Sequence, residues 1–78
     1  MSAEKSDAEL REELRLVEDD IESLRRSAVQ LRQSVGEDEP GDFADRASAI
    51  AAAEEQESLA EQFEARREEL LKRLGETR

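Results

Sequence analysis

Residues 10–35 have the sequence LREELRLVEDDIESLRRSAVQLRQSV, and the apolar positions within it decide the fold. These positions are Leu10, Leu14, Val17, Ile21, Leu24, Ala28, Leu31 and Val35. They follow one another at alternating steps of four and three residues, which is the spacing of a coiled-coil seam along one side of a helix. Before them, Ser6 and Glu9 have the S-x-x-E spacing of a capping box, and Gly36 after them is a common helix stop. We therefore predict a first helix over residues 6–35, preceded by a disordered N-terminus at residues 1–5.

A short acidic segment follows this helix, over residues 36–42. It contains Gly36, Pro40 and Gly41, which interrupt a helix, and it is short enough to force an antiparallel return of the chain. Residues 36–45 contain five acidic residues and no basic one, out of a net charge of −10 for the whole chain. We predict an acidic turn at the tip of a hairpin.

The return segment is expected to form a second helix over residues 43–74, with a disordered end at residues 75–78. Its predicted seam consists of Ala49, Ala52, Gln56, Leu59, Phe63, Arg66 and Leu70. An antiparallel register then places Leu24 opposite Leu59 and Val17 opposite Arg66, with the Arg66 guanidinium reaching Glu13 or Asp20. The expected fold is all-α: a single domain built as an antiparallel two-helix coiled-coil hairpin.

Apolar residues also lie outside the predicted seams. On the second helix they are Ile50, Ala53, Ala60, Leu71 and Leu74, and a lone hairpin of this size buries little surface. From Ile50, Ala53, Ala60 and Leu71 we predict a self-association stripe that could pair two hairpins into a homodimeric four-helix bundle. Docking to a partner protein is the alternative use of the same stripe.

Composition excludes several classes of function. The 78 residues include no Cys, no His and no Tyr, and 44% of them are charged, so we expect no catalytic residue, no metal site, no cofactor and no enzyme activity. The net charge of −10 argues against direct binding of nucleic acid. No apolar run approaches the length needed to span a membrane, and no apolar stretch typical of a secretory signal is found near Met1. The absence of Cys fits a reducing compartment, and we expect a cytoplasmic protein.

The start of the second helix contains the pattern D-x-x-D-x-A, at Asp42, Asp45 and Ala47. One interpretation is purely structural, with Asp42 as the N-cap and Asp45 three residues later, both at the positive end of the helix dipole. On that interpretation the two acids only stabilise the helix.

The other interpretation comes from a resemblance. Asp42, Asp45, Arg46, Ala47 and Ser48, followed by a long charged helix, resemble the coiled-coil tip of the DksA/TraR family. The family resemblance implies a helical hairpin whose acidic tip enters the secondary channel of bacterial RNA polymerase, where polymerase supplies the chemistry. The chain differs from that pattern because it has no Cys for the family's four-cysteine zinc finger.

Two functions therefore stay open. The first is a non-enzymatic transcription regulator that binds RNA polymerase through its tip, at Asp42, Asp45, Ala47, Arg46 and Glu39. The second is a self-assembling hairpin adaptor or oligomerisation module, in which the tip motif is only a helix cap.

Overall fold

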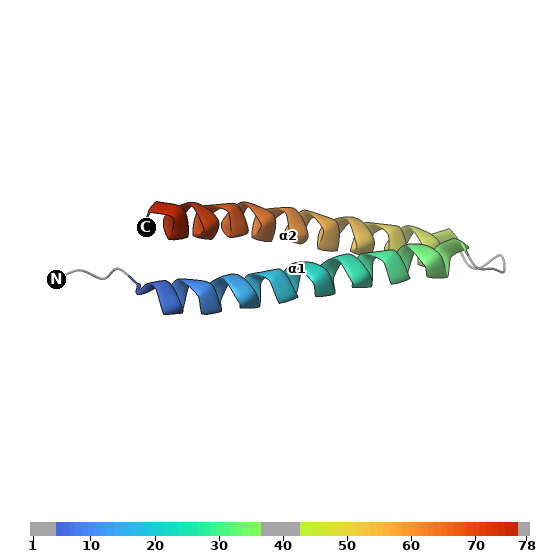
Figure 1. Cartoon of the computed structure of the whole chain (residues 1–78). Helices are drawn as coiled ribbons and strands as arrows, with labels where there is room; N and C mark the ends of the chain where they lie inside the picture. The colour runs from blue at the N-terminus through green and yellow to red at the C-terminus, as the bar shows by residue number, and fades with distance from the viewer. Residues whose placement is uncertain (1–4, 37–42, 77–78) are drawn as a thin grey trace.

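The computed structural model describes residues 5–36 and 43–76, which form two long helices. Helix α1 is Asp7–Gly36 and helix α2 is Phe43–Glu76. They pack along each other in opposite directions as a narrow rod with extents of 59 × 18 × 15 Å (Figure 1). The start of α1 and the end of α2 lie together at one end of the rod, the open end, and the connection lies at the turn end. The prediction of an all-α antiparallel hairpin is confirmed.

The first turn of α1 is closed by the predicted capping box. The Ser6 backbone N–H donates to Oε1 of Glu9 at 2.8 Å, and the Glu9 backbone N–H donates to the Ser6 hydroxyl at 3.1 Å. These bonds satisfy two backbone donors that the helix itself leaves free. The bond from the Ser6 backbone holds the pKa of the Glu9 carboxyl below its usual value, with the Ser6 hydroxyl adding to the effect.

The far ends of both helices extend past the predicted boundaries. Helix α1 includes Gly36, and α2 continues through Gly75 to Glu76, two residues that were predicted to be disordered. No glycine in the two described segments has a positive φ, so neither Gly36 nor Gly75 adopts the left-handed stop conformation. A helical glycine costs only about 1 kcal/mol relative to alanine, and the helix tolerates this cost at its last turn.

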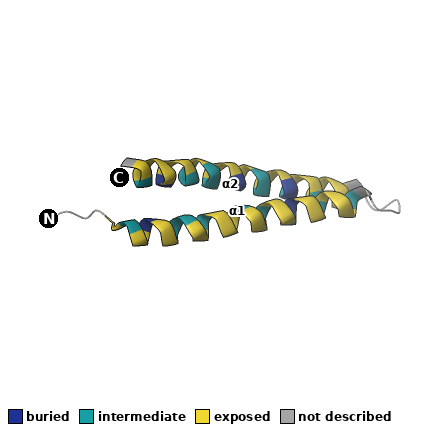
Figure 2. Cartoon of the chain, in the orientation of Figure 1, coloured by how far each residue is buried: buried dark blue, intermediate teal, exposed yellow. Residues whose placement is uncertain are grey.

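The predicted seam of α1 is confirmed. All eight of its apolar positions are buried or half-buried, and the exposed fractions of Leu10 and Ala28 are 4% and 1%. The buried positions face α2 along the length of the rod, while most other positions of α1 are exposed (Figure 2). A narrow apolar stripe on a charged helix is therefore enough to hold the second helix.

The predicted seam of α2 is wrong at Leu59, whereas its other six positions are buried or half-buried. Ala53 and Ala60, which were assigned to an outer stripe, are fully buried, whereas Leu59 is 40% exposed. The observed seam consists of Ala49, Ala53, Gln56, Ala60, Phe63, Arg67, Leu70 and Leu74, all of them buried or half-buried. With one constant antiparallel register, Leu24 lies opposite Ala60. The small side chain leaves room for the leucine, and the two backbones can approach each other closely.

Ion pairs on one side of the seam fix this register. Arg32 binds Glu57 with two parallel hydrogen bonds of 2.8 and 2.9 Å, and Arg25, one heptad earlier, binds Glu64, one heptad later. We call this side of the rod, with Arg25, Arg32, Glu57 and Glu64, the charged flank. Exposed ion pairs contribute at most about 1 kcal/mol each, so their main effect is to select the register among alternatives.

An ion-paired cluster lies on the opposite side, near the open end. Arg66 donates to Glu13 through Nε at 3.2 Å and through Nη2, as the sequence predicted, and it also binds Glu69 at 2.9 Å. Lys5 binds the other oxygen of Glu13 at 2.6 Å. The bonds from Lys5 and then Arg66 lower the pKa of Glu13 to about 2. Lys5, which was predicted to be disordered, is therefore tied to α1.

Candidate functional site

The candidate site is the turn end of the rod, of which the structure describes the first turns of α2. Asp45, Arg46 and Ala47 are all exposed there. Two further predicted tip residues, Glu39 and Asp42, lie outside the described residues. The described part of the tip therefore presents one acid, one base and one small side chain to solvent.

The Asp45 carboxylate is not used in a cap formed by described residues. Neither Asp45 nor Arg46 makes a side-chain hydrogen bond or ion pair with any residue in the two described segments. The start of α1 is different, since Glu9 is bonded to Ser6 in a complete capping box. Asp45 nonetheless occupies the first turn of α2, where the positive end of the helix dipole favours a negative charge. Within residues 5–36 and 43–76, no side chain therefore competes with a partner for the Asp45 carboxylate.

Ala47 is the third described residue of the motif. It is exposed and lies two residues after Asp45. Alanine adds only a methyl group to the width of the helix, and it is the best helix former. The turn end is therefore slender beside its acidic residue.

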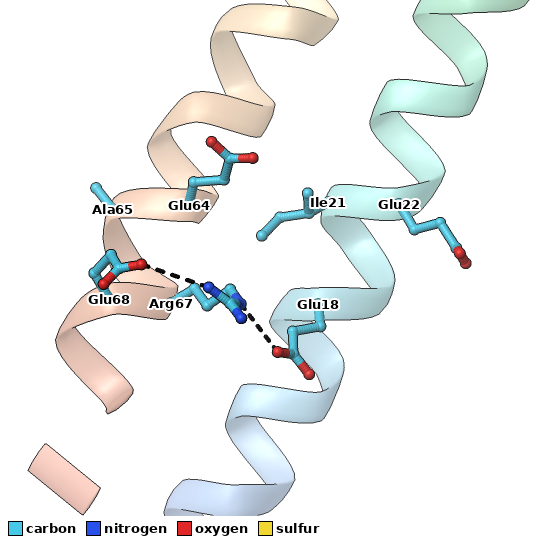
Figure 3. A pocket seen from close by; sticks show the side chains of 7 residues that line it. All are labelled: Glu18, Ile21, Glu22, Glu64, Ala65, Arg67 and Glu68. Carbon is cyan, nitrogen blue, oxygen red and sulfur yellow. Dashed lines mark hydrogen bonds and ion pairs between the residues drawn. The ribbon is translucent and has the colours of Figure 1, made fainter. Parts of the chain in front are cut away.

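A groove on the charged flank is another possible binding site. It is a shallow, open depression lined by Glu18, Ile21, Glu22, Glu64, Ala65, Arg67 and Glu68 (Figure 3). Arg67 crosses it, with Nε 2.9 Å from Oε2 of Glu18 and Nη1 3.5 Å from Oε2 of Glu68. The Arg67 guanidinium therefore bridges an acid of α1 and an acid of α2 across the groove, while Arg25 and Arg26 bind Glu64 and Glu22. The groove is thus occupied by ion pairs that hold the two helices together.

Metal binding and membrane insertion find no support in the described segments. No group of three His, Cys, Asp or Glu residues at residues 5–36 and 43–76 is placed to hold a metal ion. Within the same residues, neither helix is long and apolar enough to cross a membrane.

The predicted self-association stripe is not one surface. Ala53 and Ala60 are fully buried against α1, so their assignment to an outer interface is wrong. Ile50 and Leu71 are exposed by 37% and 38%, and they lie at opposite ends of α2. Glu57 and Glu64, both engaged in ion pairs, lie between them on the same side of the helix.

Most ion pairs between the helices were missed from the sequence. Only the Arg66–Glu13 pair was expected, whereas Arg25, Arg32 and Arg67 also bind acids of the opposite helix. Arg25 and Arg32 follow seam residues by one position, the place from which coiled coils form such pairs. If charged residues one position after a seam residue had been matched across the antiparallel helices, the Arg25 and Arg32 pairs would have been predicted.

Comparison with known proteins assigns the chain to no family: no family model, no curated protein and no solved structure matches it.

Proposed function

We propose that the chain is a non-enzymatic, cytoplasmic regulator that inserts its acidic turn end into a basic or metal-bearing channel of a partner protein. The observation that carries the proposal is Asp45, an exposed acid at the turn end with no partner among the described residues. Asp42 and Glu39 are close to it in sequence, so the partner would meet several negative charges at once.

The shape of the molecule supports insertion. The rod is 59 Å long and only 18 × 15 Å across, and both helix ends at its base lie far from the turn. A slender rod can bring its tip into a cavity that a globular domain could not enter. The interhelical ion pairs hold α1 and α2 in one register, so the start of α2 keeps its position relative to the open end.

Bacterial RNA polymerase is the partner that we propose. The motif of Asp42, Asp45, Arg46 and Ala47 resembles the tip of the DksA/TraR family, whose members act in the polymerase secondary channel. In this role Asp42 and Asp45 would contact cationic groups, and Ala47 would keep the tip narrow. The hairpin itself would supply position and charge, and any chemistry would belong to the polymerase.

The proposal is tested by capture of core RNA polymerase on the purified, immobilised chain. We expect the double variant Asp42→Asn, Asp45→Asn to lose at least tenfold in affinity, because charge pairs at a partly desolvated interface are strong. Asparagine caps a helix as well as aspartate, so circular dichroism should show unchanged helicity.

A matched control removes the same charge elsewhere. Glu54 and Glu61 are exposed on α2 away from the turn, and Glu54→Gln, Glu61→Gln also reduces the negative charge by two. This control should bind polymerase like the native chain. Equal binding by the tip variant, the control and the native protein would reduce the motif to a helix cap, and no capture of polymerase by the native chain would remove this partner.

A further inference from the structure

The seam does not bury the same amount of apolar surface along the whole rod. In the constant register, each residue of the α1 seam faces one residue of the α2 seam, and the two form one layer. At the open end Leu10 faces Leu74 and Leu14 faces Leu70, so each of these layers contains two leucines. Burial of apolar area is the main source of stability. The layers at the open end therefore contribute the most to holding the helices together.

The layers nearer the turn are poorer in large side chains. The two layers closest to the turn each pair one large residue of α1 with an alanine of α2, as Leu31 does with Ala53. In the next layer toward the open end, Ala28 faces Gln56, and neither helix supplies a large apolar side chain. The apolar seam is thus interrupted at the level of Gln56.

Gln56 also carries a buried polar atom without a partner. Its Oε1 atom is buried, and no donor among the described residues bonds to it. Ala28, on the opposite helix, is 1% exposed and has no side-chain donor. A buried oxygen without a donor raises the free energy of the paired state, and it gains hydrogen bonds to water when the helices separate. Separation at this layer therefore costs less free energy than separation at an apolar layer.

The interhelical ion pairs fall on either side of the same division. We call residues 28–36 and 43–57 the turn part, and residues 5–27 and 58–76 the base part. In the described segments, four arginine–glutamate pairs join the helices, one within the turn part and three within the base part. In that order they are Arg32–Glu57, Arg25–Glu64, Arg66–Glu13 and Arg67–Glu18. None of these four pairs ties the turn part of one helix to the base part of the other.

We propose that the turn part opens and closes as a unit while the base part stays paired. In the open form the helices separate from the Ala28–Gln56 layer to the turn, and Gln56 binds water. Helical segments of this length are marginal in isolation, so their backbone amides lose protection when they separate. The opening is a minor excursion from the paired state, which keeps the register. It gives the end of the rod that bears Asp45 a motion of its own, and it does not depend on polymerase binding.

Hydrogen exchange of the native chain, followed at single amides by NMR, tests the division. Relative to their intrinsic rates, amides at residues 29–35 and 48–55 should exchange at least tenfold faster than amides at residues 14–24 and 60–70. The two turn-part segments should share similar protection, because they open together. Equal protection in both parts, or a gradual loss of protection from Gln56 to the helix ends, would overturn the proposal.

Two matched leucines of α1 show whether the two parts open separately. Leu31 lies in the turn part and Leu14 in the base part, and both are half-buried seam residues. Leu31→Ala should accelerate exchange in the turn part at least tenfold. Leu14→Ala should do so in the base part but change exchange in the turn part less than twofold, because its contacts persist when only the turn part is open. Similar acceleration of the turn part by both variants would show a single cooperative unit and refute the division.

Gln56→Leu tests the interrupted layer with a change that should stabilise the chain. It replaces the unpaired carboxamide by an apolar side chain, so exchange in the turn part should slow at least tenfold. Gln62→Leu is the matched control, since Gln62 is exposed on the same helix, and it should change exchange less than twofold. Unchanged exchange in Gln56→Leu, or an equal effect of Gln62→Leu, would contradict the role of this layer.

Discussion

Leu70 and Leu71 allow a direct measurement of what the seam contributes to stability. They are adjacent leucines on α2, and the exposed fraction is 0% for Leu70 and 38% for Leu71. Leu70 is also the largest side chain that is completely buried among the described residues. Replacing each by alanine removes the same atoms from two different environments, so the pair isolates the effect of burial.

The expected cost follows from burial. Truncation of a fully buried leucine to alanine destabilises a protein by about 2–5 kcal/mol, since the lost transfer energy is increased by the cavity left behind. Leu71 is partly exposed and can be truncated without leaving a closed cavity, so Leu71→Ala should cost about 1 kcal/mol. A chain of this length has a total unfolding free energy of roughly 4–12 kcal/mol. Leu70→Ala should therefore remove a large part of the stability and lower the melting temperature by roughly 10 °C or more.

Urea denaturation followed by circular dichroism at 222 nm provides the comparison. Both variants and the native chain are measured at two protein concentrations tenfold apart, so that any contribution of association is visible as a shift of the midpoint. The seam would be refuted as the source of stability if Leu71→Ala cost as much as Leu70→Ala at both concentrations.

Two further predictions concern the open end and the close approach of the helices. Lys5 and Arg66 lower the pKa of Glu13 to about 2 in the folded chain. In the unfolded chain the pKa of this carboxyl is about 4.3, so its ion pairs contribute their full stabilisation above that pH. The contribution is lost as the pH falls toward 2. The difference in unfolding free energy between the native chain and Glu13→Gln should thus shrink between pH 5 and pH 2, and a difference that grows on acidification would contradict the ion-paired cluster. Ala60→Leu should destabilise the hairpin by about 1–3 kcal/mol through overpacking, whereas Ala65→Leu, at an exposed position of α2, should be nearly neutral in the same urea titration.

The first helix could be predicted almost completely from the sequence. Its seam residues are large and isolated, from Leu10 to Val35, so only one phase of the four-three pattern fits them. The capping box at Ser6 was equally clear, because its geometry depends on residues three positions apart and on nothing distant.

The second helix was ambiguous for a physical reason. Residues 51–53 are all alanine, and Leu59 is followed by Ala60, so two phases of the pattern are compatible with the sequence. Hydrophobicity alone favours burying Leu59. The packing against α1 reverses that choice, since Ala60 is fully buried and Leu59 is 40% exposed. A small residue in the seam lets the two helices approach closely, which a leucine there would prevent. Such a choice depends on the partner helix and cannot be made from one helix by itself.

The candidate site at the turn end is a prediction from the sequence. Asp45, Arg46 and Ala47 are exposed, as a contact surface requires, and Asp45 is not bonded within a cap formed by described residues. Glu39 and Asp42 lie outside the described residues. Whether a partner binds there depends on the charge and shape of the partner, which no property of this chain alone determines.

The position of the helix ends has a practical consequence. Because α1 begins and α2 finishes at the same end of the rod, an attachment at either end of the chain holds that end and leaves the opposite end of both helices pointing outward. Molecules captured on a sensor surface through an N-terminal or a C-terminal tag should therefore display the end of α1 and the start of α2 in the same orientation. If the hairpin were inserted into a loop of another protein, it would project from that protein as a rod. The reason is that α1 begins and α2 ends at the same end of the hairpin.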